Sequence, residues 1–149
     1  MSTPLKIVEC PRDAMQGIKQ FIPTTAKVQY LQSLLRCGFD TLDFGSFVSP
    51  KAIPQMADTA EVLRGLDLSA TQTKLLAIVA NLRGAQDAVK FEEIDYLGYP
   101  FSISEIFQMR NTHKTIAESV EILSEILEIA ERSNKKVGAY LSMGFGNPY

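Results

Sequence analysis

The chain alternates between short apolar stretches and longer stretches whose apolar residues recur at helical spacing. The apolar stretches predict strands at residues 6–9, 41–44, 74–80, 93–97 and 137–143. The third stretch is almost continuously apolar, which is typical of a strand buried on both faces of a parallel sheet. Helical spacing predicts helices from Thr24 or Thr25 to Gly38, and at residues 59–66, 81–89 and 115–130. This alternation predicts an α/β fold with a parallel sheet and right-handed crossovers.

Residues at the expected helix ends support this assignment. Thr24 or Thr25 and Asn81 are candidate N-caps, and Thr115 with Glu118 has the pattern of a capping box. Gly38 is expected to adopt the left-handed conformation that ends a helix. The glutamates of the last helix are interpreted as its solvated face. Residues 98–114 are predicted to form a long loop.

Two architectures fit this order of elements: an open doubly wound sheet, or part of a (β/α)₈ TIM barrel. A whole barrel takes about 250 residues, and five strands fall short of it. The 149 residues predict one domain. The chain stops directly after a strand, in a Gly/Pro turn at residues 144–149, without a helix to cover that strand.

Composition narrows the classes of partner. The net charge is −2 and no run of Lys and Arg stands out, so neither nucleic acid nor a membrane surface is an expected partner. The N-terminus lacks the pattern of a signal peptide, and Cys10 and Cys37 are expected to be free thiols. A cytoplasmic protein is therefore expected.

Polar residues gather at the point where each predicted strand ends. In chain order they are Arg12, Asp13 and Gln16; Asp43 and Ser46; Asn81; Ser102, Ser104 and Glu105; and Ser142. The carboxyl ends of parallel strands share one rim in either architecture, which predicts a common site there. The alternative is that these are ordinary polar loop residues.

The residue types at this rim suggest chemistry on an anionic substrate with a hard cation. Asp13 and Asp43 offer oxygen ligands for Mg²⁺ or Mn²⁺, and Arg12 offers a permanent positive charge. Such a set can stabilise a developing enolate, although a complete metal site needs more ligands. His113 is the only histidine, and we interpret it as a surface residue near the start of a helix.

Several blocks resemble 3-hydroxy-3-methylglutaryl-CoA lyases. Residues 7–16, IVECPRDAMQ, resemble the signature VEVGPRDGLQ of that family. Residues 43–51, DFGSFVSPK, followed by PQMAD at 54–58, resemble a second block of it. Ser104, Glu105 and Asn111 are similar to the fourth loop of the family, and residues 140–149 are similar to its fifth strand. The likeness extends over nearly the whole chain and in the same order.

This resemblance implies a fold, a reaction and a set of site residues. The fold is a (β/α)₈ barrel, and the reaction is the cleavage of hydroxymethylglutaryl-CoA to acetyl-CoA and acetoacetate with a divalent cation, within leucine catabolism. Asp13 would bind the metal, Arg12 would stabilise the enolate oxygen, and Asp43 would handle a proton and hold the arginine. The implied substrate-binding residues are Gln16, Ser46, Phe47, Lys51 and Ser142. The implied partner is an acyl-CoA substrate.

The chain also departs from the family pattern. Cys10 and Ala14 replace two glycines, Asp43 replaces a glutamate, and Asn147 replaces a cysteine. A His-x-His pair, an asparagine and a catalytic cysteine expected from later strands are absent from this sequence. We therefore expect the N-terminal part of a longer lyase-like protein, inactive and oligomeric or aggregation-prone as an isolated chain. A related aldolase or acyl-CoA condensing enzyme, and a non-catalytic α/β binding domain, are the alternatives.

Overall fold

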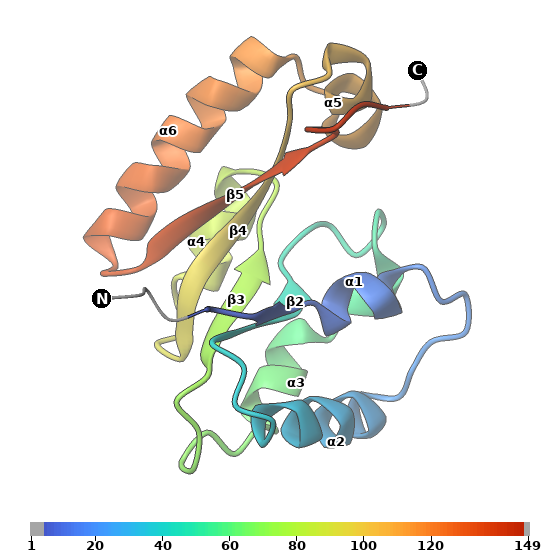
Figure 1. Cartoon of the computed structure of the whole chain (residues 1–149), viewed down its shortest axis with the longest axis vertical. Coiled ribbons are helices and arrows are strands. Elements are labelled where there is room, and N and C mark those ends of the chain that lie inside the picture. Colours follow the sequence, from blue (N-terminus) through green and yellow to red (C-terminus); the bar gives the residue numbers. More distant parts are fainter. Residues whose placement is uncertain (1–4, 148–149) are drawn as a thin grey trace. The chain divides into compact units, whose positions relative to one another are not determined.

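The computed structural model describes residues 5–147, which contain five strands and six α-helices. The strands are hydrogen-bonded neighbours in the order β1-β2-β3-β4-β5 (Figure 1). The chain divides into two compact units, Met1–Ala77 and Ile78–Tyr149, which are described in turn.

The first unit contains the elements that carry most of the predicted site residues. These elements are β1 (Val8–Glu9), α1 (Pro11–Gln16), α2 (Thr24–Leu35), β2 (Thr41–Ser46), the 3₁₀ helix η1 (Pro54–Met56), α3 (Thr59–Arg64) and most of β3 (Lys74–Ile78). β1 pairs with β2 in parallel, with Val8 opposite Thr41. Every residue of β2 is buried, because α1 and α2 both pack against this strand.

The core of the first unit is apolar and closely packed. It includes Leu31, Leu42, Phe44 and Leu75, all almost fully buried. Gly45 marks its tightest point, because a Cβ atom there would lie 2.5 Å from the methyl group of the Thr59 side chain. β2 can therefore approach α3 only with glycine at this position.

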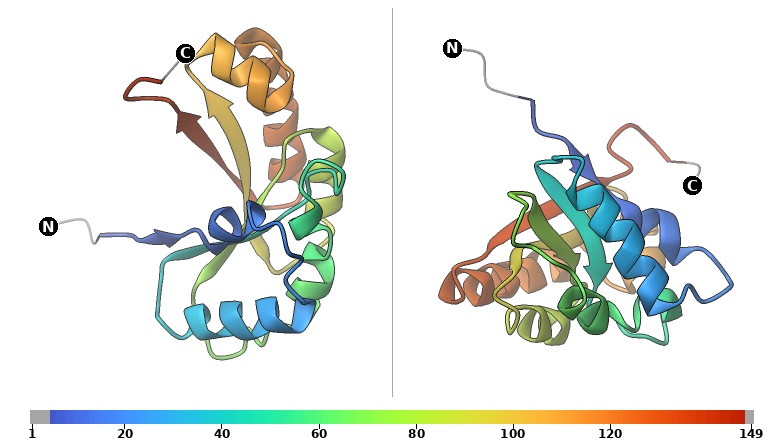
Figure 2. Two further views of the ribbon diagram at one scale, coloured as in Figure 1. Left: turned by 90° about the vertical axis from the view of Figure 1, so that its right-hand side faces the viewer. Right: turned by 90° about the horizontal axis from the view of Figure 1, so that it is seen from below.

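The second unit pairs the two remaining strands in parallel. Its elements are α4 (Leu82–Ala88), β4 (Ile94–Ser102), α5 (Glu105–Thr112), α6 (Ile116–Arg132) and β5 (Lys136–Ser142). The register runs from Tyr96 opposite Lys136 to Ser102 opposite Ser142. Figure 2 shows α5 and α6 on one side of β4 and β5, and Ile94, Leu97 and Ile126 are buried there.

The parallel pairing and most elements confirm the sequence-based predictions, but two α-helices and the short 3₁₀ helix η1 were missed. Residues 105–112 form helix α5 inside the predicted long loop, and residues 11–16 form helix α1 where a loop was expected. Each begins with a start signal that outweighs its weak amphipathicity: Ser104 caps α5, accepting a hydrogen bond from the Phe107 N–H at 3.4 Å, and Pro11 occupies the first turn of α1.

The predicted helix ends were mostly right. The Asn81 cap, the Thr115–Glu118 capping box and the left-handed Gly38 are all present. The predicted cap at Thr24 or Thr25 is wrong, because Pro23 holds the N-cap position and the Thr24 hydroxyl instead donates to Asp58 at 2.7 Å. Pro148 and Tyr149, the end of the predicted final turn, lie outside the described residues.

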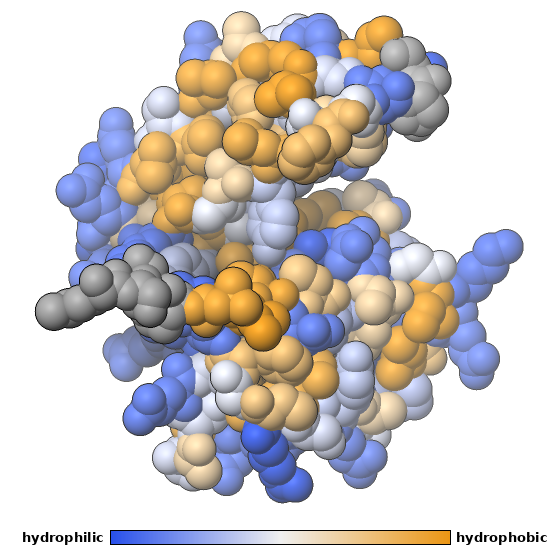
Figure 3. Space-filling model, in the orientation of Figure 1, coloured by the Kyte–Doolittle hydropathy of each residue, from blue (hydrophilic) through white to orange (hydrophobic). Residues whose placement is uncertain are grey.

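Each unit leaves apolar side chains exposed next to a strand. In the first unit these are Leu5, Ile7 and Val8 around β1, and in the second Leu141 on β5 and Phe145 after it. Figure 3 shows apolar atoms gathered over β5 and, separately, beside the start of β1. Surfaces of this kind usually mark places where further protein packs.

Candidate functional site

Arg12, on helix α1 directly after β1, forms a buried ion pair with Asp43 of β2. Asp43 is the third of the six residues of β2, so it lies within the strand and not at its end as predicted. Nε of Arg12 donates to Oδ1 of Asp43 at 3.2 Å, and Nη2 donates to Oδ2 at 2.6 Å. Asp43 is completely buried and Arg12 is 9% exposed. Two parallel hydrogen bonds fix the plane of the guanidinium as well as its position. The orientation of Arg12 is therefore set by β2.

Asp13 and Gln16 hold the other edge of the same guanidinium. Nη1 of Arg12 donates to Oδ1 of Asp13 and to Oε1 of Gln16, both at 2.9 Å. Gln16 also donates to Oδ1 of Asp13 at 3.0 Å. All three residues lie on α1, where positions one turn apart share a face. The structure thus brings together four predicted site residues, with the Asp13 side chain 65% exposed at the edge of the group.

Helix α1 explains why these side chains converge. Cys10 occupies its N-cap position. Pro11 lacks an N–H, which costs nothing in the first turn because N–H groups there have no partner within the helix. Asp13 places a negative charge near the positive end of the helix dipole. A loop would leave Arg12 and Gln16 without a fixed spacing. Because Arg12 and Gln16 are four residues apart, the short helix places both side chains on the same face.

Ser46 ends β2, and Phe47 and Lys51 follow it, but the three residues differ in exposure. Ser46 is buried, its hydroxyl accepts a hydrogen bond from the Val48 N–H at 3.2 Å, and its own N–H donates to Thr59 at 3.1 Å. Phe47 is half-buried, and Lys51 is exposed. Within residues 5–147 no hydrogen bond or ion pair joins the Lys51 side chain to the Arg12 group.

The predicted residues of the second unit have mainly structural contacts. The Ser142 carbonyl accepts a hydrogen bond from the Ser102 hydroxyl at 3.0 Å, and Ser142 itself is half-buried. Ser104 and Asn81 cap helices. His113 is exposed at the end of α5 in the left-handed conformation, which agrees with its interpretation as a surface residue.

Burial also affects Cys10, next to the Arg12–Asp43 pair. Partial burial raises the pKa of the Cys10 thiol, and the negative charge of Asp43 raises it further, while Arg12 opposes this. A thiol with a raised pKa is a poor nucleophile at neutral pH. Cys10 is therefore better suited to packing than to covalent catalysis.

The described residues offer one good metal ligand here rather than a complete set. No cluster of three or more His, Cys, Asp or Glu side chains occurs within the described part of the chain. Both oxygens of Asp43 are bonded to Arg12, whereas Asp13 is exposed and uses only Oδ1 in its hydrogen bonds to Arg12 and Gln16. Asp13 thus fits the role of a single carboxylate ligand.

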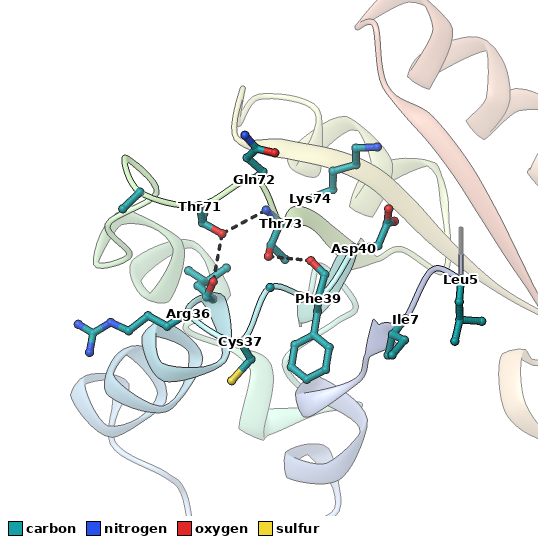
Figure 4. A pocket seen from close by; sticks show the side chains of 13 residues that line it. Leu5, Ile7, Arg36, Cys37, Phe39, Asp40, Thr71, Gln72, Thr73 and Lys74 are labelled. Carbon is teal, nitrogen blue, oxygen red and sulfur yellow. Dashed lines mark hydrogen bonds between the residues drawn. The ribbon is translucent and has the colours of Figure 1, made fainter. Parts of the chain in front are cut away.

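A pocket in the first unit lies at the amino ends of the strands. It has a volume of about 740 Å³ and is lined by residues at the amino ends of β1, β2 and β3, among them Ile7, Asp40 and Lys74 (Figure 4). Thr71 and Thr73 in its wall already donate to the carbonyls of Leu35 and Phe39. In α/β barrels the amino ends of the strands serve stability rather than catalysis, so this pocket is not the candidate site.

Sequence reasoning missed the polar cluster of Lys27, Gln55 and Asp58 behind the site. Lys27 is 2% exposed, and its ammonium lies 2.6 Å from Asp58 and also donates to the Gln55 carbonyl. One signal was present in the sequence, because Lys27 lies four residues before Leu31 and so shares its buried face. A lysine on a buried face is expected to have a partner there.

Comparisons with known proteins agree with this geometry. The chain is 35% identical to a Gallus gallus protein named mitochondrial hydroxymethylglutaryl-CoA lyase, over 97% of this chain and 48% of the relative. It is 36% identical, with the same coverage, to a Pseudomonas aeruginosa 3-hydroxy-3-isohexenylglutaryl-CoA/hydroxymethylglutaryl-CoA lyase. No protein-family model matches.

Solved structures give the same result. The hydroxymethylglutaryl-CoA lyase of Pseudomonas aeruginosa matches with a TM-score of 0.89 at 34% identity, over 97% of this chain and 48% of that one. The lyase from Acinetobacter baumannii, solved with coenzyme A and 3-methylmalate, also has a TM-score of 0.89, at 31% identity over 97% of this chain and 47% of that one.

These matches confirm the predicted fold class, a partial (β/α)₈ TIM barrel of five parallel strands with intervening helices. The homologues that share this fold are carbon–carbon lyases. Within that class, the chain is similar to the hydroxymethylglutaryl-CoA lyases, and it spans about half the length of the curated relatives it matches.

The expectation of a cytoplasmic protein is wrong. The relatives from Gallus gallus, Macaca fascicularis and Bos taurus are named mitochondrial, while one from Rattus norvegicus is named cytoplasmic. The compartment thus varies among proteins that share this sequence pattern, so composition and the first residues cannot assign it. No helix within residues 5–147 is long and apolar enough to span a membrane.

Proposed function

We propose that this chain supplies the arginine-bearing part of a hydroxymethylglutaryl-CoA lyase site. In the whole protein that site would cleave 3-hydroxy-3-methylglutaryl-CoA to acetyl-CoA and acetoacetate. The observation that carries the proposal is the fixed guanidinium of Arg12, bound along one edge by buried Asp43 and along the other by Asp13 and Gln16.

The reaction requires a positive group at the thioester end of the substrate. When the C3 hydroxyl loses its proton, the C2–C3 bond breaks, and its electron pair passes to C2 and the thioester carbonyl. The C3 side leaves as acetoacetate, while the C2 side is the enolate of acetyl-CoA, which then takes up a proton at C2. Arg12 would stabilise the enolate oxygen, a task for which a preorganised cation in a partly dry site is well suited.

Asp43 fits the role of a positioning residue for Arg12. Its side chain is completely buried, and both carboxylate oxygens accept hydrogen bonds from the guanidinium. The proposal therefore assigns Asp43 to holding the arginine, the second of the two tasks that the resemblance implies for it. The shorter aspartate still reaches Arg12, at 2.6 Å.

Asp13 would hold a divalent cation, Mg²⁺ or Mn²⁺, through its exposed carboxylate. Oxygen ligands suit such hard cations, and the bound ion would add Lewis-acid polarisation of substrate oxygens. Asp13 also contacts Arg12 and Gln16, so its position relative to the guanidinium is fixed. Further ligands would come from outside the described residues.

The substrate would be an acyl-CoA. Gln16, Ser46, Phe47, Lys51 and Ser142 are the proposed substrate-binding residues. Gln16 lies directly against Arg12, and exposed Lys51 is free to turn toward a phosphate. The Acinetobacter baumannii relative was solved with coenzyme A, which supports this class of ligand.

A chimeric protein tests this function. This chain would replace the matching half of the Pseudomonas aeruginosa lyase, to which it is 36% identical. We expect the chimera to release acetoacetate from hydroxymethylglutaryl-CoA with Mg²⁺. Arg12→Met should lower kcat by about 10²–10³-fold, the usual share of an oxyanion donor. Arg83→Met, at a side chain that is 92% exposed, is the matched control and should leave kcat unchanged.

The outcomes separate the candidate functions. A folded chimera that releases no acetoacetate, or one in which Arg12→Met has full activity, would overturn the proposal. Condensation of acetyl-CoA with a 2-oxo acid in place of cleavage would favour the alternative, a related condensing enzyme.

A further inference from the structure

Gln55 is a buried glutamine whose side-chain amide makes all its hydrogen bonds with one loop. It is 3% exposed, and it lies on η1, at the end of the segment that carries Ser46, Phe47 and Lys51. Its amide nitrogen donates to the carbonyls of Ile18 and Gln20, both at 2.9 Å, and its amide oxygen accepts from the Ile22 N–H at 2.8 Å. Both amide hydrogens therefore have partners, and so does the oxygen.

The loop that Gln55 holds has little other support. Residues 18–22 connect α1 to α2, and their other hydrogen bond runs from the Ile18 N–H to the Met15 carbonyl. A pocket of about 240 Å³ lies against this loop, between Gln16, Phe21 and Gln55. Ile18 and Phe21 are about half exposed. Apolar packing contributes little here, so the Gln55 side chain fixes the loop.

A second group of contacts fixes Gln55 itself. Lys27 on α2 donates to the Gln55 main-chain carbonyl, pairs with Asp58 at 2.6 Å, and lies 4.2 Å from the centre of the Phe21 ring. Thr24 donates to the other oxygen of Asp58 at 2.7 Å. A buried ammonium with these partners cannot move far without losing them. Gln55 is thus held on a rigid base.

We propose that Gln55 is a positioning residue that locks the α1–α2 loop and, through Gln16, supports the edge of the Arg12 guanidinium that Asp43 does not hold. The loop begins directly after Gln16, whose side chain oxygen accepts a hydrogen bond from Nη1 of Arg12. Gln55 also connects this loop to the segment that carries the proposed acyl-CoA contacts. This role rests on the function proposed above.

The first test needs no activity and uses the whole 149-residue chain. In Gln55→Met the side chain keeps its length but loses three hydrogen bonds. Amide hydrogen exchange at Ile22 should become about tenfold faster or more, as local opening becomes easier. Gln55→Leu, which also removes the acceptor of the Ile22 N–H, is the second variant if the first does not fold. Unchanged exchange at Ile22 in a folded variant would overturn the proposal.

The second test uses the chimera with the Pseudomonas aeruginosa lyase. Gln55→Met should lower kcat by about 10- to 100-fold, because a displaced arginine stabilises the transition state less well while the binding of the substrate is unchanged. The KM for the acyl-CoA should stay near its original value. Gln108→Met is the matched control, since Gln108 is an equally buried glutamine with two side-chain hydrogen bonds in the second unit. Its kcat should not change.

The two tests distinguish the possible failures. Equal kcat losses in Gln55→Met and Gln108→Met would make Gln55 a purely structural residue and overturn its positioning role. An inactive chimera with the unaltered chain would overturn the proposed function instead, while exchange at Ile22 would still decide whether Gln55 holds the loop.

Discussion

Arg12 and Asp43 each depend on the other for their burial. A guanidinium or a carboxylate placed alone in this interior would lose its hydration without compensation, at a cost of several kcal/mol. Together they form two parallel hydrogen bonds, at 3.2 and 2.6 Å. The same pairing gives Arg12 a single orientation.

Replacing Asp43 by asparagine tests this dependence through the nearby thiol of Cys10. The pKa of Cys10 is raised by burial first and by the Asp43 carboxylate second, so Asp43→Asn should lower it. The rate of alkylation by iodoacetamide should therefore reach its midpoint at a lower pH. The measurement uses a Cys37→Ser background, which removes the exposed second thiol.

The same variant should lower the free energy of unfolding by about 3 kcal/mol, because it leaves Arg12 buried without its charge partner. Glu131→Gln, at an exposed carboxylate that makes no side-chain hydrogen bond within the described residues, controls for the loss of one negative charge. An alkylation midpoint that does not move in folded Asp43→Asn would contradict the electrostatic coupling between Asp43 and Cys10.

Single residues of the site were partly predictable from the sequence. Arg12, Asp13 and Asp43 could be placed together because parallel strands end at one rim. Their hydrogen-bond pattern could not, because it depends on α1, which has six residues and too few turns for a periodic signal. Gln55 could not be found either, since its partners are backbone atoms more than 30 positions away in the chain.

At the scale of elements, prediction succeeded where the signal is local. The last helix, α6, begins at Ile116 after a complete capping box, as its sequence indicates. α5 was missed because its residues show no clear apolar stripe and its start rests on one capping serine. β4 extends to Ser102, five residues beyond the predicted end at Leu97, because pairing with β5 continues there.

The capping box of α6 should make stability depend on pH. Glu118 accepts the Thr115 N–H at 2.8 Å, and this hydrogen bond is the main reason that its pKa is lowered from 4.5. A carboxylate whose pKa is lowered in the folded state stabilises the protein at pH values above the pKa that it has in the unfolded state. This contribution is lost as the pH falls through the pKa of the folded state. The stabilisation should therefore be complete at pH 7 and fade below about pH 4.5.

Denaturant unfolding of the chain and of Glu118→Gln at pH 7 and at pH 3 would measure this. The difference in free energy of unfolding between them should shrink at the lower pH. Glu121→Gln, on the same helix and with no side-chain hydrogen bond within the described residues, controls for the loss of a charge. A difference that is the same at both pH values would show that the Glu118 carboxylate does not stabilise the cap.

At the scale of the whole molecule, the chain has about half the length of its relatives. Each of its units has an incompletely covered strand. Every residue of β5, from Lys136 to Ser142, is exposed or half-buried, and Leu141 is 64% exposed. In the first unit, Leu5 and Ile7 are exposed beside β1. The length of the chain predicts a single domain, and this remains a prediction.

These uncovered strands should cause the isolated 149-residue chain to associate with itself. An edge strand with exposed apolar side chains presents unpaired N–H and C=O groups to any second strand, and association buries the apolar area as well. Light scattering should show a mass above the 16.5 kDa of one chain, rising with concentration. Leu141→Lys should reduce this association, because a charge on an edge strand opposes pairing. Tyr30→Lys, at an exposed residue of helix α2, should leave it unchanged. A stable monomer at all concentrations would contradict the prediction, and equal effects of both variants would show that β5 is not the surface involved.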